Sequence, residues 1–572
     1  MERYLETDVL VIGAGGAGMY AAIAAASAGR EVLLLDKSLI GRSGATIMAQ
    51  MTVAAAIGEE EPDDWRFHLE DTIKAGRGLV DEPLARILCQ SAPERIWQME
   101  EWGVGWARSG DHVTQVHAPG HDRKRCVYVD FLSTGPAATR TLRKQCRRHD
   151  NIRRISDLTI TDLLLGDGRA VGAVGLYLET GAPVTIAAKA TIIATGGLTS
   201  LYRRNSASAN MGGDGFALGL RAGAALIDME FVQFFPIGHL APRLIGMDPI
   251  MWDPFRYKLG GRLLNGEMEE FTQNYGTAED GKYVVSRDMA TYAIFKEVEA
   301  GRGSPHGGVW LSFEHVPEAD LRAAFGPVID RLADNGIDLT RMAIEVSPIA
   351  HYHMGGLRVD DTLATDVANL FAAGEAVGGA NGANRLSGNA ITEAFVFGEL
   401  AGRSAAEAAA KSSMPDVRDV ASPYLAVIDE AGRRPESDGA RTPTAAIADL
   451  QSILQRDVGP FRTGDGLKRA LAAIAELADE LPLMATGGAM AFNQQFADWL
   501  ALRNMLEVAR TIAAAALART ESRGAHQRED HPSLDEAWTC NQIIRRNNSE
   551  IGGGITLSRA EVRRLPALEA AP

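Results

Sequence analysis

The sequence predicts an α/β protein whose main domain has a Rossmann-like dinucleotide-binding fold, and three features of the chain carry this prediction. Residues 8–36 read as a strand, a glycine-rich turn, a helix and a second strand. Residues 370–402 repeat the order of strand, glycine-rich turn and helix far downstream. After residue 411, apolar residues recur at helical spacing. We therefore expect a nucleotide-binding fold that an inserted segment interrupts and a helical domain follows.

The first strand, turn and helix have the glycine pattern of a dinucleotide site. A buried-type strand at 8–12 leads into the turn, and a second strand at 31–35 ends in Asp36. The glycines are Gly13, Gly15 and Gly18, spaced as G-x-G-x-x-G. They permit a tight turn and close approach of a pyrophosphate, and the acid can accept hydrogen bonds from ribose hydroxyls. The alternative is a turn that only packs the helix, and the order of all four elements favours the dinucleotide site.

Length and charge exclude several classes of protein. With 572 residues, 46% of them hydrophobic, the chain can bury large cores and should form several domains. A net charge of -16 argues against nucleic acid or an anionic membrane surface as a partner. Residues 9–29 carry no charge and are long enough to resemble a membrane span, but their glycines and strand–turn–helix order argue against one. We also see no secretory signal.

The cysteines indicate free thiols. Cys89, Cys126, Cys146 and Cys540 form no C-x-x-C pair and no cluster with histidine. We therefore expect no iron–sulfur, zinc or other metal site in this chain. Such spacing fits a reducing compartment, so the expected location is the cytoplasm, or the cytoplasmic face of a membrane complex reached through a partner.

The segment from His351 to Asn389 carries the most specific pattern. It contains HYHMGG, a short strand at 370–373 ending in glycine and Glu375, and GANRLSGN. This series resembles the closing signature of the succinate dehydrogenase, fumarate reductase and L-aspartate oxidase flavoprotein family, in which it surrounds a flavin. The loop ESRGAHQREDHP near 521–532 is similar as well, so the resemblance covers nearly the whole chain.

The resemblance implies a domain order and a cofactor. We expect the first part of an FAD-binding domain at 1–225, an inserted capping domain that closes over the substrate at 226–345, the second part of the FAD-binding domain at 346–410, and a C-terminal helical domain at 411–572. The expected contacts to FAD are Gly13, Gly15, Gly16, Gly18, Asp36, Lys37, Ser43, Gly44, Ala45, Thr46, Ala194, Thr195, Gly196, Asp214, Glu375, Arg385, Asn389, Ala390 and Ile391.

One departure from the family concerns the attachment of the flavin. Members with covalent FAD carry a histidine in a loop of the type R-S-H-T after the second strand. Here the loop reads GRSGATIMAQ, with Gly44 and Ala45 at the matching place. No imidazole is available there, so we expect FAD to be bound without a covalent bond.

The family also implies the residues that act on a carboxylate substrate. Arg287, followed by Asp288, matches the arginine that exchanges a proton with the substrate; without the family, a surface ion pair would be preferred. His351 matches the histidine that hydrogen-bonds the carboxylate, and Arg385 the arginine that holds it. A guanidinium suits this role because its planar fork binds a carboxylate through two hydrogen bonds.

A proton relay is less well matched. The family pairs an acid and an arginine in a T-E-G-x-R segment, and WDPFR offers Asp253 and Arg256 at the same separation. The loop is longer here and its glycines are missing, so a loop ion pair is the alternative.

The substrate pocket departs most strongly from the family. Phe235 stands where a carboxylate-binding histidine is expected, and Ile237 and Trp252 stand where threonines are expected. Asn381 replaces the histidine before GANR. A second carboxylate would lose its hydration without gaining a partner, at a cost of several kcal/mol. We therefore expect a monocarboxylate or a bulkier acid rather than succinate or fumarate.

Three functions follow from these expectations. The first is an FAD-dependent oxidoreductase that moves hydride between flavin N5 and a carbon–carbon or carbon–nitrogen bond beside a carboxylate. The second is an amino-acid oxidase like the L-aspartate oxidases, and the third is an electron-transfer flavoprotein subunit with an iron–sulfur partner. The expected partners are a small carboxylate and an iron–sulfur subunit, with self-association left open. A nicotinamide-dependent dehydrogenase fits least, because the single dinucleotide fingerprint is needed for FAD.

Overall fold

A computed structural model of the chain describes residues 3–130, 132–244, 250–252, 259–275, 287–434, 441–547 and 554–566, with backbone only for 287–289. The chain forms two compact units. The first unit comprises residues 1–203, 207–232 and 352–572, and the second comprises 204–206 and 233–351. The boundaries at 232/233 and 351/352 fall inside two strands, β13 and β16.

The first unit is built on a seven-stranded sheet in the order β8-β2-β1-β11-β10-β9, with β18 also paired to β11. The strands are β1 (Tyr4–Ile12), β2 (Val32–Leu35), β8 (Ile152–Ile155), β9 (Leu158–Gly166), β10 (Arg169–Tyr177), β11 (Pro183–Ile193) and β18 (Leu370–Ala372). The pairs β8–β2, β2–β1, β1–β11 and β11–β18 are parallel. Ile12 pairs with both Leu35 and Ile193, and Ile193 pairs with Ala372. The carboxyl ends of four strands therefore meet at one edge, where open α/β sheets bind ligands.

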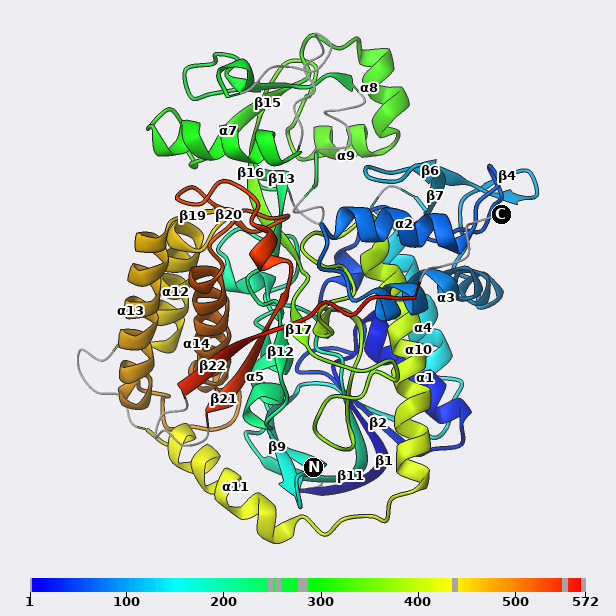
Figure 1. Cartoon of the computed structure of the whole chain (residues 1–572), viewed down its shortest axis with the longest axis vertical. Coiled ribbons are helices and arrows are strands. Elements are labelled where there is room, and N and C mark those ends of the chain that lie inside the picture. Colours follow the sequence, from blue (N-terminus) through cyan, green and yellow to red (C-terminus); the bar gives the residue numbers. More distant parts are fainter. Residues whose placement is uncertain are drawn as a thin grey trace. The chain divides into compact units, whose positions relative to one another are not determined.

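Two helices lie close together against this sheet. Helix α1 (Gly16–Ser27) and helix α10 (Asn389–Ala410) run side by side (Figure 1). A Cβ on Gly398 would lie 2.6 Å from the carbonyl oxygen of Ala17, and one on Gly402 would lie 2.4 Å from that of Ala21. The glycines are required because no side chain fits between the two backbones. This packing places the N-termini of both helices near the carboxyl edge of the sheet.

Further helices and short strands of the first unit lie outside its main sheet. The helices are α2 (Trp65–Ala75), α3 (Glu82–Glu101), α4 (Thr134–Cys146) and α5 (Asp214–Arg221). The short strands are β3 (Val53–Ala54), β4 (Arg108–Ser109), β5 (His112–Val113), β6 (Gln115–His117), β7 (Lys124–Val127), β12 (Leu226–Ile227) and β17 (Gly356–Leu357). Helix α4 packs on α1 and on the turn at Thr46–Met48.

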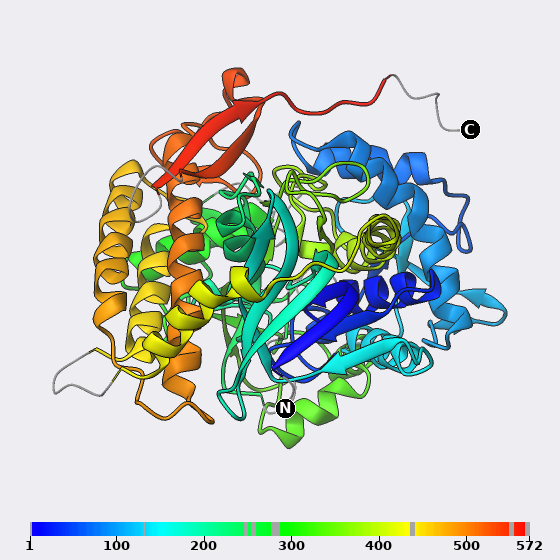
Figure 2. The ribbon, with the colours of Figure 1, turned by 90° about the horizontal axis from the view of Figure 1, so that it is seen from below.

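The C-terminal region begins with helices, as the apolar periodicity predicts. They are α11 (Arg418–Gly432), α12 (Pro443–Asp457), α13 (Gly464–Glu480) and α14 (Gln494–Ala518). The region also contains strands that the periodicity did not indicate: β19 (Phe461–Arg462), between α12 and α13, pairs with β20 (Gln527–Arg528), and β21 (Asn541–Asn547) forms a hairpin with β22 (Gly554–Ala560). Figure 2 shows this hairpin in red beside α14. Strand β21 also pairs with β12, which joins the end of the chain to its middle.

The second unit contains a four-stranded sheet in the order β13-β16-β15-β14. Its elements are β13 (Val232–Ala241), β14 (Arg262–Leu264), β15 (Val309–Ser312), β16 (Ile344–His353), α7 (Arg287–Glu299), α8 (Glu318–Phe325) and α9 (Val328–Asp334). Its core is aromatic, because the rings of Phe313 and Phe325 lie 6.2 Å and 5.8 Å from that of Trp252.

Across the described ranges, no helix has the length and apolar character needed to cross a membrane.

Candidate active site

The glycine-rich turn after β1 has no room for side chains at two positions. Gly13 has φ +102°, and a Cβ there would lie 2.4 Å from the carbonyl oxygen of Ala194. A Cβ on Gly18 would lie 1.8 Å from the carbonyl oxygen of Gly13. The amide of Gly16 donates to Thr46 Oγ1 at 3.1 Å. The turn therefore presents bare backbone at the start of α1, as close approach of a pyrophosphate requires.

Asp36 links the loop that follows β2 to this glycine-rich turn through hydrogen bonds. Its Oδ2 accepts from the amide of Ala14 at 2.9 Å, and its Oδ1 accepts from the amide of Ser38 at 2.8 Å. The hydroxyls of Ser38 and Ser43 lie 2.6 Å apart. A carboxylate has further lone pairs, so Asp36 can still accept from a ribose hydroxyl.

Lys37 and Asp214 neutralise each other. Lys37 Nζ lies 2.6 Å from Asp214 Oδ2, and Asn504 Nδ2 donates to Asp214 Oδ1 at 2.8 Å. Burial would raise the pKa of Asp214, but Lys37 and Asn504 outweigh it, so the pKa lies below its usual value. The amide of Gly44 donates to Ser208 Oγ at 2.8 Å. These contacts tie the predicted cofactor loop, which includes Ala45, to the N-terminus of α5.

Strand β11 ends before the predicted glycines. It stops at Ile193, and Gly196, which adopts φ +74°, turns the chain away from the sheet. The hydroxyl oxygen of Thr195 is buried and makes no hydrogen bond within the described residues.

Glu375 lies against this turn. A Cβ on Gly197 would lie 2.2 Å from Glu375 Oε1, and that oxygen accepts from the amide of His353 at 3.0 Å. Burial raises the pKa of Glu375 to about 8. His353 is itself buried and contacts the carbonyl of Met229 through Nε2 at 3.1 Å, as expected of a core histidine.

The N-terminus of α10 supplies a second set of backbone donors. Gly388 adopts φ +85°, and the helix begins at Asn389 followed by Ala390 and Ile391. Asn389 Oδ1 lies 2.9 Å from His68 Nε2, which fixes the first turn. The first four amides of a helix have no partner inside it, and their positive end attracts anions. With α1 beside it, this arrangement fits a pyrophosphate and flavin ring, so the residues present match FAD.

Arg385 sits on a buried polar cluster formed by Tyr352, Asn381 and Glu393. Its guanidinium lies 4.4 Å from the centre of the Tyr352 ring. The Tyr352 hydroxyl donates to Glu393 Oε2 at 2.6 Å, and Asn381 Nδ2 donates to the same oxygen at 2.7 Å. Asn381, predicted to line the substrate pocket, therefore has a clear structural role, while its contact with a ligand stays a prediction.

Glu393 is the acid of this cluster, and we expect its protonation to make the stability of the protein depend on pH. It is fully buried, its Oε1 has no partner within the described residues, and burial raises its pKa to about 7. The folded protein thus holds a proton that the unfolded chain has lost between about pH 4.5 and 7. As pH rises through this window, Glu393 makes folding less favourable.

A Glu393→Gln variant is therefore expected to gain stability relative to wild type as pH rises from 4.5 to 7, by up to about 3 kcal/mol. Urea unfolding of both apoproteins at several pH values measures the difference. Because the other buried acids are common to both proteins, a constant difference across the window would show that Glu393 is already ionised at the lower pH.

In the second unit, His351 has a polar and an aromatic neighbour. Its Nδ1 lies 2.7 Å from Ser206 Oγ, and the Phe235 ring packs edge-on at 5.5 Å. Ile237 and Trp252 are fully buried, and the Trp252 indole donates to His239 Nδ1 at 3.1 Å. The assignment of these apolar residues to a substrate pocket stays a prediction.

The structure does not test three of the predicted catalytic residues. Asp253 and Arg256 fall outside the described residues. Arg287 begins helix α7, and its side chain is not described.

The sequence reasoning missed Tyr352 and Glu393. Both belong to predicted segments, HYHMGG and TEAFVFGELAG. The signal that could have found them is an ionisable side chain in each of two otherwise apolar or glycine-rich runs.

Comparison with known proteins decides the family. Residues 8–391 match the FAD binding domain family, and residues 447–567 match the family described as fumarate reductase flavoprotein C-term. The chain belongs to the FAD-dependent flavoproteins of the fumarate reductase and succinate dehydrogenase family. It is therefore an FAD-dependent oxidoreductase.

The family members similar to this chain match it over almost its whole length. It is 36% identical over 550 residues to a fumarate reductase (CoM/CoB) subunit of Methanothermobacter marburgensis, covering 95% of this chain and 97% of that one. It is 34% identical over 567 residues to the fumarate reductase flavoprotein subunit of Mycobacterium tuberculosis, covering 95% of each. The Mycobacterium smegmatis Sdh1 structure in complex with UQ1 superimposes with a TM-score of 0.91 at 34% identity, covering 99% of this chain and 96% of that one.

Proposed function

We propose that this flavoprotein transfers hydride between N5 of FAD and a carbon–carbon or carbon–nitrogen bond adjacent to a carboxylate, on a substrate other than plain succinate or fumarate. The observation that carries the proposal is Arg385, a largely buried guanidinium fixed over Tyr352 at 4.4 Å on the same segment that starts α10. Bound FAD supplies hydride acceptance and donation. The residues of this chain bind and orient the acid.

Each proposed residue has a role that follows from its own chemistry. Arg385 would hold the carboxylate through two hydrogen bonds. His351 would donate one more, with Ser206 at its Nδ1 fixing the ring. Arg287 would exchange the proton with the carbon opposite the hydride, and Asp253 and Arg256 would pass that proton to solvent.

The proposed substrate has an apolar or aromatic far end. Phe235 packs on His351, and the family's polar residues at 237 and 252 are replaced by Ile237 and Trp252. Phe235 and Ile237 have no hydrogen-bond donor, and the indole N–H of Trp252 is already donated to His239. A second carboxylate would therefore be buried without a partner, at a cost of several kcal/mol.

Anaerobic titration of the purified holoenzyme with a panel of carboxylic and amino acids tests the proposal through the visible absorption of the flavin. We expect one bulky or aromatic monocarboxylate to bleach it, or the corresponding unsaturated acid to reoxidise chemically reduced enzyme. A response to fumarate or succinate would show that Phe235 does not exclude dicarboxylates. Silence from every acid would contradict the proposal and favour a subunit that only transfers electrons.

We further propose that FAD is bound without a covalent bond. The loop that carries Gly44 and Ala45 contains no histidine, cysteine or tyrosine between Gly41 and Gln50. After acid precipitation of the holoenzyme, all of the flavin is expected in the supernatant. Yellow, fluorescent protein in the pellet would disprove this expectation.

The protein is also proposed to work with a partner. Two similar proteins are named as subunits, which supports a partner chain, and we propose that this partner carries an iron–sulfur cluster.

A further inference from the structure

Glu393 lies in the buried polar cluster that carries Arg385, although the proposed function gives it no role. Tyr352 connects the two residues: its ring centre lies 4.4 Å from the guanidinium of Arg385, and its hydroxyl donates to Glu393 Oε2 at 2.6 Å. Asn381 donates to the same oxygen at 2.7 Å. Because Tyr352 is 3% exposed and Glu393 is fully buried, water screens the charges of Arg385 and Glu393 from each other less than it would at the surface.

The hydrogen bonds of Glu393 suit a neutral carboxyl group. Both donors converge on Oε2, and Oε1 is buried without a partner among the residues that the structure describes. A neutral carboxyl has a carbonyl oxygen that accepts hydrogen bonds and a hydroxyl that carries the proton. An ionised carboxylate would instead place part of its charge on a buried oxygen that has no hydrogen bond. The geometry therefore favours a proton on Oε1, and the pKa of Glu393, raised by burial to about 7, agrees with it.

The other titratable groups described around Glu393 fall into two sets. Burial keeps one set neutral between about pH 6 and 8.5, because it lowers the pKa of two histidines and raises that of a tyrosine. These are His68 on α2, and His353 and Tyr352 on β16. Glu375, in the turn after β18, has a pKa raised to about 8 by burial and by the charge of Glu393. Since Arg385 stays ionised, the charge of this cluster changes first at Glu393 and then at Glu375.

The protonation of Glu393 affects how strongly Arg385 attracts an anion. The charge of Arg385 favours the ionised form of Glu393, and by the same interaction an ionised Glu393 offsets the charge of Arg385. A carboxylate bound to Arg385 would in turn disfavour ionised Glu393, because like charges repel strongly where water is excluded. Binding of the carboxylate and binding of the proton therefore favour each other, and to the same extent.

We propose that Glu393 is a positioning residue for the proposed reaction: as a neutral acid it does not offset the charge of Arg385, and it takes up a proton when the substrate carboxylate binds. The inference rests on the proposed function, because it uses Arg385 as the residue that holds the carboxylate. The proton comes from solvent and goes to Oε1 of Glu393. The bound carboxylate replaces the negative charge that this proton removes, so the net charge of the site does not change.

Calorimetric titration of the holoenzyme with benzoate tests this coupling without turnover. Benzoate joins a carboxylate to an aromatic ring and has no bond that the flavin can oxidise. Titrations in two buffers of different ionisation enthalpy give the number of protons taken up, and the same data give Kd at each pH. If binding raises the pKa of Glu393 by roughly one, wild type should take up about half a proton per benzoate near pH 7.5. Its Kd should then be about five- to tenfold weaker at pH 8.5 than at pH 6.

Two variants change the proton-binding group in different ways. Glu393→Gln resembles the neutral acid, so it should lose most of the proton uptake, and its Kd should change less than about twofold over the same pH range. Tyr352→Phe keeps the ring beside Arg385 but removes a hydroxyl that favours the ionised form of Glu393. Its Kd should therefore begin to weaken at a higher pH than that of wild type.

Glu399→Gln is the matched control. It removes an acid from the same helix, where Glu399 pairs with Arg403 and faces Arg95 of α3, and it should behave like wild type. Any titration of His351 is common to all four proteins. Flavin content is measured in each of them, so that a loss of cofactor is not read as a loss of coupling.

The inference would be overturned if Glu393→Gln kept the proton uptake and pH dependence of wild type, which would assign the proton to Glu375. A Kd that weakens equally at every pH in Glu393→Gln would mean that Glu393 only supports the fold. An unshifted pH dependence in Tyr352→Phe, or no binding of benzoate, phenylacetate or acetate, would also contradict the inference. Proton-coupled benzoate binding by an enzyme whose flavin responds to none of the acids in the redox titration would count against the proposed function alone.

Discussion

Replacing Arg385 by leucine is expected to lower kcat/KM for the carboxylate substrate by roughly 30- to 5,000-fold, or about 2 to 5 kcal/mol of binding to the transition state. Arg385 is 9% exposed and its guanidinium is held over the Tyr352 ring, so a bound carboxylate would lose most of its hydration there. Without the arginine, this buried negative charge has no partner from that side. Steady-state turnover of the holoenzyme with the acid found by titration measures the loss.

Two further variants test whether the loss comes from the guanidinium of Arg385 itself. Arg385→Lys keeps the charge but loses the planar fork, so it should recover only part of the activity. Arg358→Leu removes an exposed arginine from the same part of the chain and should change kcat/KM less than twofold. Since Arg385 is also a predicted contact of the cofactor, flavin content is measured in each variant. Full activity of a flavin-loaded Arg385→Leu enzyme would remove Arg385 from substrate binding.

The dinucleotide fold could be predicted because its signal is local. Gly13 and Gly18 must be glycine for steric reasons that the sequence records directly, since a Cβ would lie 2.4 Å and 1.8 Å from carbonyl oxygens. The helical character of the C-terminal region was predictable for the same reason, because helical spacing of apolar residues is visible within a window of about 11 to 18 residues. Strand β21 was not predictable in this way. Its residues pair with β12, about 300 positions earlier, and such pairing leaves no local pattern.

Site residues that belong to a sequence motif were predictable. Ion pairs and pKa shifts that arise from burial in the folded protein were not. Asp36 and Arg385 stand at motif positions, and the structure shows what holds each one. Lys37 and Asp214 were each expected at the cofactor, but only the fold reveals their ion pair across 177 positions. Glu393 gains its raised pKa from burial beneath Arg385 and Tyr352. No sequence pattern reports a dielectric environment that long-range packing produces.

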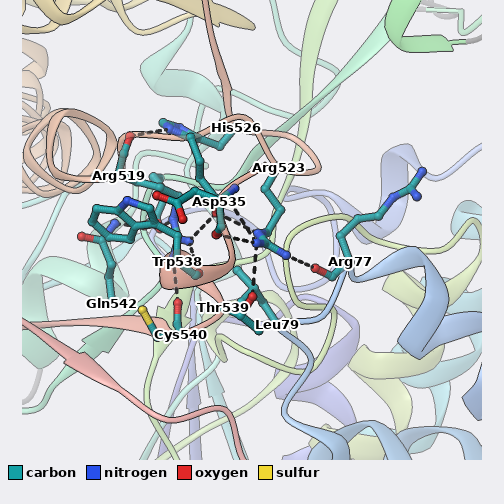
Figure 3. A network of polar contacts seen from close by, with 12 residues as sticks. Arg77, Leu79, Arg519, Arg523, His526, Asp535, Trp538, Thr539, Cys540 and Gln542 are labelled. Atoms are coloured by element: carbon teal, nitrogen blue, oxygen red, sulfur yellow. Dashed lines mark hydrogen bonds and ion pairs between the residues drawn. The ribbon is translucent and has the colours of Figure 1, made fainter. Parts of the chain in front are cut away.

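The second large effect concerns stability, and it centres on Arg519 in the loop region after α14. This fully buried guanidinium donates to Glu230 Oε1 at 2.6 Å, to Glu521 Oε1 at 2.9 Å, and to the carbonyls of Trp538 and Cys540, each at 2.9 Å. Figure 3 shows Arg519 beside Arg523, whose Nη1 reaches the carbonyl of Arg77 at 2.8 Å. The cluster thus joins the end of the chain to residues near 77 and 230.

An Arg519→Leu variant is expected to lose about 3 to 5 kcal/mol of unfolding free energy, because removing one partner leaves buried charge without compensation. Glu521 would keep Arg523 at 2.7 Å, so the loss falls mainly on Glu230, whose Oε2 already has no partner within the described residues. Urea unfolding of the apoprotein at pH 8 measures it. Arg545→Leu, which removes an exposed arginine of β21 that pairs with Asp366, should cost less than about 1 kcal/mol.

The pH dependence separates an electrostatic cause from lost packing. Burial and the charge of Glu230 raise the pKa of Asp228 to about 7, and Arg519 opposes this rise. Without Arg519, the folded variant should hold this proton to higher pH, so its penalty grows as pH rises above about 7. The stability gap to wild type is therefore expected to be larger at pH 8 than at pH 5. Replacing both Arg519 and Glu230 by leucine should recover part of the loss at pH 8, since no unpaired charge then remains at Glu230. A gap that is equal at both pH values, and is not reduced in the double variant, would mean that Arg519 stabilises the protein through its contacts with Trp538 and Phe231 instead.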